Sequence, residues 1–99
     1  MSKYEVRKWD YFNEDRYSGY SVNGTLSDYE IVFTGSSKED CIKWLKVKYL
    51  DLAIKTIEDL DDAVVHIFEL DCDRLNYTRT YDSDAYYEYR STTWVVTCY

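Results

Sequence analysis

The sequence predicts an α+β fold: an antiparallel sheet of about five to six strands with one long helix packed on one face, in the order β-β-β-α-β-β-β. One segment, from Ser36 to about Leu60, has helical periodicity and contains no glycine or proline. Stretches of alternating apolar and polar residues on both sides of it are typical of half-buried strands. Short polar turns between these stretches favour antiparallel neighbours. The 99 residues suit one domain, 1–99.

The helix is predicted to begin at a capping box. Ser36-Ser37-Lys38-Glu39 fits the S-x-x-E pattern, in which serine and glutamate bond each other's free backbone N–H groups. A rotation of about 100° per residue gathers one apolar arc against the sheet. This arc contains Cys41, Ile42, Leu45, Tyr49, Leu52 and Ala53. A second apolar group is expected to widen the same side, so that the helix bends or restarts near Lys48. It contains Val47, Leu50, Ile54 and Ile57.

Three strands are expected before the helix, at residues 3–12, 17–22 and 29–34. The first mixes apolar and charged residues on both sides, which indicates an edge strand or a partly solvated face. Residues 13–16 are polar and are expected to form a turn. Asn23-Gly24 is the strongest hairpin signal, because both residues tolerate positive φ. A looser connection through Ser27-Asp28 is the alternative.

Three more strands are expected after the helix, at residues 63–70, 75–81 and 85–98. The strand at 63–70 is the most apolar and is expected to be central. In the last strand, Trp94, Val96 and Cys98 should face one way, and Val95 and Tyr99 the other. The sheet face away from the helix is expected to be partly exposed and rich in tyrosine.

Catalytic and cofactor chemistry has little support in the sequence. His66 is the only histidine and lies in an apolar strand, where a half-buried structural role is expected. Asp71-x-Asp73 and Asp82-x-Asp84 lack the glycine and glutamate positions of a calcium loop. There is no His/Cys cluster for zinc and no glycine-rich phosphate loop. We therefore expect neither a cofactor nor an enzyme.

The cysteines and the N-terminus bear on the cellular compartment. Cys41, Cys72 and Cys98 are odd in number and widely spaced, which predicts free thiols in a reducing cytoplasm. The first residues lack the apolar region of a secretory signal. No run approaches the ~20 apolar residues of a membrane span.

The charge of the chain is strongly asymmetric. Residues 1–50 contain eight acidic and eight basic groups, whereas residues 51–99 contain eleven acidic and four basic groups, a net charge of −7. Such a half attracts basic partners and repels nucleic acid and anionic membranes. Carboxylates beside tyrosines predict a surface for a basic protein, such as a nucleic-acid-binding protein or nuclease. Its candidate residues are Glu58, Asp59, Asp61, Asp62, Asp71, Asp73, Tyr81, Asp82, Asp84, Tyr86, Tyr87 and Glu88. The alternative is an acidic surface that only maintains solubility.

In overall character, this small, acidic, proline-free chain without enzyme motifs resembles phage-encoded inhibitors of bacterial defence, notably anti-CRISPR proteins and DNA mimics. The resemblance covers the whole chain but no motif, so it assigns no residue. It implies a non-enzymatic inhibitor that binds a defence protein, such as a CRISPR effector, and blocks its basic nucleic-acid-binding surface. The alternative is a structural or assembly module of a phage or bacterial complex that oligomerises, for example as a homodimer, through the tyrosine-rich sheet face.

Overall fold

The computed structural model describes the backbone of residues 3–16, 20–58 and 61–99. Its elements are β1 (Tyr4–Arg16), β2 (Tyr20–Leu26), β3 (Glu30–Gly35), α1 (Lys38–Ile57), β4 (Val64–Leu70), β5 (Arg74–Asp82) and β6 (Tyr86–Cys98). One helix and an antiparallel sheet of six strands confirm the predicted α+β fold and its element order.

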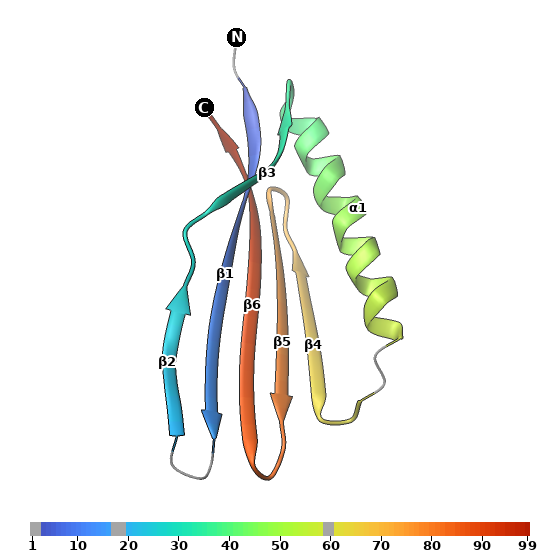
Figure 1. Ribbon diagram of the computed structural model, residues 1–99. Helices are drawn as coiled ribbons and strands as arrows, with labels where there is room; N and C mark the ends of the chain where they lie inside the picture. Colours follow the sequence, from blue (N-terminus) through green and yellow to red (C-terminus); the bar gives the residue numbers. More distant parts are fainter. Residues whose placement is uncertain (1–2, 17–19, 59–60) are drawn as a thin grey trace.

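The sheet is built on the two longest strands, β1 and β6, which pair without a break from Tyr4↔Cys98 to Arg16↔Tyr86. The strand order is β2-β1-β6-β5-β4, and β3 also pairs with β1. Because β2 pairs with residues 11–16 of β1 and β3 with residues 4–8, β2 and β3 lie end to end along one edge of β1 (Figure 1).

One expectation about strand position is wrong, and one pair of alternatives is resolved. β4, which was expected in the centre, is an edge strand. β1 is internal and mostly half-buried, which agrees with a partly solvated face and not with an edge position. β4 has apolar residues on both faces, but the helix covers only one of them. Val65 and Ile67 face away from it and are 54% and 47% exposed. An apolar run therefore did not imply a central strand.

Two predicted turns are also wrong. Residues 13–16 continue β1, and Asn23-Gly24 lies inside β2. The alternative connection near Ser27 is confirmed: its N–H donates to the Asp10 carbonyl at 2.8 Å, and its hydroxyl accepts from the Asp10 N–H at 2.9 Å. Gly24 serves close packing instead, since a Cβ there would overlap the Tyr11 hydroxyl. Residues 17–19 of the predicted second strand lie outside the described residues.

The N-terminal cap of the helix is Ser37, one residue later than Ser36, the first residue of the predicted capping box. The Ser37 hydroxyl, on an extended backbone, accepts from the Asp40 N–H at 3.2 Å, and Glu58 caps the other end. The helix runs without interruption between these caps. The predicted arc is correct, since Cys41 and Leu45 are fully buried. The expectation that the second apolar group widens this buried side is wrong. Its members are exposed, because they point away from the sheet. They are Val47, Leu50, Ile54 and Ile57.

The hydrophobic core lies between α1 and one half of the sheet. It contains Val6, Cys41, Leu45, Leu75, Trp94 and Val96. Across this core, Trp44 stacks on Phe33 and Tyr49 meets Phe68 edge-on, with ring centroids 6.0 and 5.8 Å apart. Among the described residues, no helix is long and apolar enough to cross a membrane.

The long strands extend past this core. We call the half under α1 the covered end. We call residues 12–16 of β1, residues 86–90 of β6 and the β5–β6 turn the bare end (Figure 1). The molecule is accordingly elongated and thin, with extents of 55 × 28 × 16 Å.

Candidate functional site

The structure separates the predicted carboxylates into two groups at opposite ends of the sheet. Asp71 and Asp73 form the turn between β4 and β5, at the covered end. Asp82 and Asp84 lie at the other end of β5. Nine residues of β5 separate the two turns, at about 3.3 Å per residue, so the groups lie roughly 25–30 Å apart. One contact patch cannot contain both groups unless it spans the length of the strand.

Four carboxylates lie at the bare end, and we call them the acidic cluster: Asp61, Asp62, Asp82 and Asp84. Glu58 lies apart from them, at the C-terminal cap of α1. The Asp82 N–H donates to the Ala63 carbonyl at 2.9 Å, which joins the β5–β6 turn to the segment that precedes β4. The Asp61 carboxylate accepts from the Ala63 N–H at 2.9 Å and fixes its own turn. All four residues of the cluster are exposed. Asp59 lies outside the described residues.

A fifth carboxylate adjoins the cluster on the sheet face away from the helix. Tyr87 of β6 pairs with Asp15 on β1 and with Asp82 on β5, so a tyrosine lies between two aspartates in one row. Asp15 is absent from the sequence-derived set, because that set comes from the acidic half of the chain, residues 51–99. The lack of glycine and proline in residues 11–16 is the signal that β1 could continue.

Tyr86 and Glu88 lie on the other face, in a hydrogen-bonded network. Glu14 and Glu88 are cross-strand partners, and the Tyr86 hydroxyl lies 2.7 Å from a carboxylate oxygen of each. The hydrogen bonds to Glu14 and then Glu88 raise the pKa of Tyr86 well above its ordinary value. One phenolic proton must therefore serve two carboxylates. Tyr81 packs on Tyr86, with ring centroids 5.9 Å apart.

Arginines balance this pair of glutamates. The Arg90 guanidinium bonds the Glu88 carboxylate, and Arg79 lies 3.7 Å from it. Burial raises the pKa of Glu88, but hydrogen bonds from Tyr86 and Arg90 outweigh burial and lower it overall. Only 14% of the Glu88 side chain is exposed. Glu88, Tyr81 and Tyr86 thus hold the strands together rather than project from the surface.

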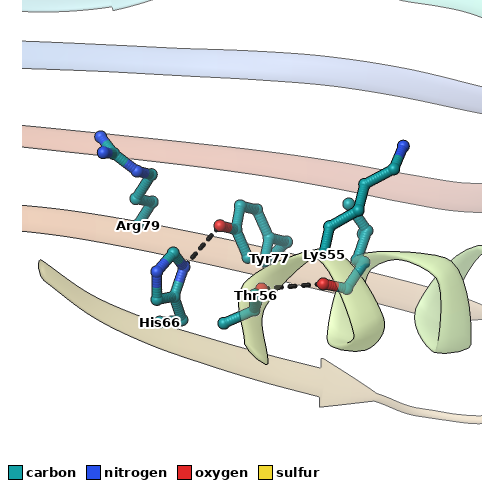
Figure 2. Close-up of a pocket in the computed structure, with 6 residues that line it drawn as sticks. Lys55, Thr56, His66, Tyr77 and Arg79 are labelled. Atoms are coloured by element: carbon teal, nitrogen blue, oxygen red, sulfur yellow. Dashed lines mark hydrogen bonds between the residues drawn. The ribbon is translucent and has the colours of Figure 1, made fainter. Parts of the chain in front are cut away.

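The histidine lines a small pocket at the edge of the helix (Figure 2). Its Nδ1 lies 2.6 Å from the Tyr77 hydroxyl, and the pocket has a volume of about 240 Å³. The lining residues are Leu52, Lys55, Thr56, His66, Tyr77 and Arg79. Three of the polar side chains have protein partners: Lys55 pairs with Asp51 at 3.2 Å, Arg79 lies 3.7 Å from Glu88, and the Thr56 hydroxyl donates to the Leu52 carbonyl at 2.8 Å. The pocket is therefore a packing gap with a half-buried histidine, as predicted, and a weak candidate for a catalytic centre.

Metal and thiol chemistry find little support in the described part of the chain. It contains no group of three or more His, Cys, Asp or Glu residues that could hold a metal ion. All three cysteines are free thiols. Burial raises the pKa of the Cys41 thiol, which disfavours the reactive thiolate.

The face away from the helix is partly exposed and aromatic, as expected. Tyr11 and Tyr89 meet edge-on with ring centroids 5.8 Å apart, and Trp9 lies at the same distance from Tyr29. Its middle is polar but uncharged: the Asn76 amide donates to Ser91 and Thr93 hydroxyls at 3.0 and 2.8 Å, respectively.

Comparisons with protein-family models, with curated proteins and with solved structures give no match to this chain. Its function has to be inferred from the acidic cluster, the aromatic face and the other surfaces described above.

Proposed function

We propose that this protein is a non-enzymatic inhibitor whose acidic cluster binds, and so blocks, a basic nucleic-acid-binding surface of another protein. The observation that carries the proposal is the convergence of exposed carboxylates from two separate segments at one end of the sheet. These segments are residues 61–62, which precede β4, and residues 82–84, at the end of β5 and in the β5–β6 turn. Residues 61–64 and 82–86 contain no lysine or arginine, and Arg16 lies opposite Tyr86 at this end of the sheet.

The charge and shape of the molecule both support this mechanism. A net charge of −7 steers the protein toward basic surfaces and accelerates association at low salt. The molecule is only 16 Å across in its smallest extent, so one end of the sheet can enter an extended groove. Inhibition then requires occupancy alone, without any chemical step.

The resemblance to phage-encoded inhibitors suggests which partners to test first. A protein of bacterial defence that handles nucleic acid, such as a CRISPR effector, presents a channel lined by lysine and arginine. Carboxylates at the mouth of that channel would compete with phosphates for the same cations. Localisation in the bacterial host cytoplasm is part of this proposal.

Two double variants with equal charge changes test the proposal. Asp82→Asn/Asp84→Asn alters the acidic cluster, whereas Asp71→Asn/Asp73→Asn removes the same charge at the opposite end of the sheet. Each protein is immobilised and exposed to nuclease-treated bacterial lysate, and is also titrated into guide-loaded CRISPR effectors while target-DNA binding is measured. We expect salt-sensitive capture of a basic protein, and inhibition of DNA binding, to weaken in the first variant and persist in the second.

Equal losses in both variants would show that only net charge matters and would contradict a localised site. Binding that survives both variants and high salt would contradict the charge-based mechanism altogether.

A second candidate function has its own observation, the uncovered aromatic face. Partly exposed tyrosines such as Tyr11 and Tyr89 suit an assembly module, since tyrosine supplies rigid contact area at interfaces. This candidate predicts self-association that is insensitive to salt and that Tyr11→Ala/Tyr89→Ala abolishes. Sedimentation of that variant at low and high salt separates the two functions.

A further inference from the structure

The outward side of α1 carries an exposed row of apolar residues that neither proposed function uses. Val47, Leu50, Ile54 and Ile57 are 67%, 59%, 61% and 72% exposed, respectively. We call these four residues the outer seam. At about 100° per residue, they lie roughly opposite the buried arc around Leu45. No other element lies over this side of α1 among the described residues (Figure 1).

The spacing of the outer seam is that of a coiled coil. Successive members are three, four and three residues apart, which assigns Val47 and Ile54 to position a of a heptad, and Leu50 and Ile57 to position d. β-branched residues at a with leucine at d favour two-stranded pairs. A seam this narrow fits one partner helix rather than a sheet or a broad core.

We propose that the outer seam binds the outer seam of a second copy of this chain, with the two helices parallel. The resulting homodimer has the two helices in the middle and one sheet on each outer side. Because the seam points away from its own sheet, the second copy can approach without meeting either sheet. A two-fold axis along the helices makes the contact self-complementary.

Charges beside the seam select the parallel orientation. Lys46 occupies position g and Asp51 position e of the next heptad, and a parallel pair brings Lys46 next to Asp51 of the second copy, twice by symmetry. An antiparallel pair would instead bring the two copies of Asp51 together. The Asp51 side chain is 46% exposed, so its carboxylate remains accessible beside Lys55.

The length of the seam limits the strength of the dimer. Lys43 occupies the next seam position toward the N-terminus, so the apolar contact spans only about two heptads. Such an interface lies at or below the lower end of stable protein–protein interfaces, about 1,200 Å². We therefore expect a dimer that dissociates in the micromolar range.

Sedimentation equilibrium from about 1 µM to about 500 µM tests the proposal. The wild type should change from monomer to dimer, and Leu50→Gln/Ile54→Gln should remain monomeric across the range. Val65→Thr/Ile67→Thr is the matched control, because it removes exposed apolar side chains from β4 and should leave dimerisation unchanged. Circular dichroism should show that both variants fold, since the substituted side chains are exposed.

Charge reversal tests the orientation. Lys46→Asp and Asp51→Lys should each weaken the dimer at least tenfold at low salt. The double variant should restore it, because the introduced carboxylate of each copy would then lie beside the introduced ammonium group of the other. Single reversals without effect would overturn the parallel arrangement.

A wild type that is monomeric at the highest concentration, or a dimer that survives Leu50→Gln/Ile54→Gln, would overturn the proposal. If that monomer instead bound anionic lipid vesicles through the seam, the occupant would be a membrane surface. The proposal is independent of the acidic cluster, whose binding can be measured on the monomeric variant.

Discussion

The covered end and the bare end are built from the same two strands, yet their side chains differ in burial and charge. Val6↔Val96 and Glu14↔Glu88 are both cross-strand pairs of β1 and β6, each two residues from the strand ends. The first pair lies under α1 and is 0% and 9% exposed. The second is a pair of like charges bridged by a tyrosine. The same backbone pairing therefore supports a buried apolar core at one end and charged side chains at the other. The side chains on the strands decide which of the two forms.

The two ends should consequently differ in what holds them. Burial of apolar side chains contributes about 1.5–3 kcal/mol per large residue at the covered end. A hydrogen bond at the bare end contributes about 0.5–1.5 kcal/mol, because water competes with it. The bare end can thus present charge at little cost to the fold.

The largest effect is expected at the covered end. Leu45→Ala removes a fully buried side chain from the helix–sheet core and should lower the free energy of unfolding by about 2–5 kcal/mol, measured by denaturant titration. Leu50→Ala is the matched control on the same helix. Since Leu50 is 59% exposed, its loss in the dilute monomer should be below about 0.5 kcal/mol. Equal losses would show that the buried side of α1 is misassigned.

A smaller effect is expected where Tyr11 crosses Gly24. Gly24→Ala should displace the Tyr11 ring from Tyr89 and remove an aromatic contact of about 0.5–1.5 kcal/mol. In a Tyr11→Ala background the same substitution should be neutral or stabilising, because a strand then gains a better residue than glycine. Denaturant titration of all four proteins gives the coupling. A coupling of zero would contradict the close approach of the ring.

The network around Glu88 should give a still smaller, pH-dependent effect. The pKa of Glu88 is lowered in the folded state, so its contribution to stability is present above its unfolded pKa and is lost as pH falls through the folded value. Glu88→Gln should cost less than about 1 kcal/mol at neutral pH, since the pair is partly solvated. The difference from wild type should vanish in acid. Thermal unfolding across pH measures it, and a difference that grows in acid would contradict the assigned direction.

The cysteines should contribute nothing to stability through disulfides. A reducing agent should leave the melting temperature of the monomer unchanged, because all three thiols are free. In thiol labelling, Cys72 and Cys98 should react quickly and Cys41 only on opening of the covered end. A large drop in melting temperature would instead reveal a disulfide and count against a reducing compartment.

Local patterns were sufficient for the helix and for the order of the elements. The periodicity around Leu45 identifies the buried arc, because helical geometry depends on neighbours three and four residues away. Strand lengths and positions depend on partners far along the chain, so the pattern misplaced the end of β1 and the position of β4. The outer seam was assigned to the wrong side because the sequence does not show how much of a helix its sheet covers.

For the candidate site, too, the sequence predicts composition but not which residues the fold brings together. Composition identifies the acidic half of the chain, but the antiparallel topology divides its carboxylates. Successive turns of a meander lie at opposite ends of a sheet, so Asp73 and Asp82 are separated by the length of β5. Glu88 was expected in the binding surface. The structure pairs it with Arg90, a contact that depends on side-chain geometry.

Residue-resolved amide hydrogen exchange tests most directly whether stability is divided between the two ends. The amides of Val6 and Val96 at the covered end and of Glu14 and Glu88 at the bare end occupy equivalent positions in the same paired strands. We expect Val6 and Val96 to exchange only on global unfolding, and Glu14 and Glu88 to exchange much faster through local opening. Equal protection at both pairs would mean that the sheet opens as one unit, and would contradict a separation between a stabilising covered end and a bare end available for binding.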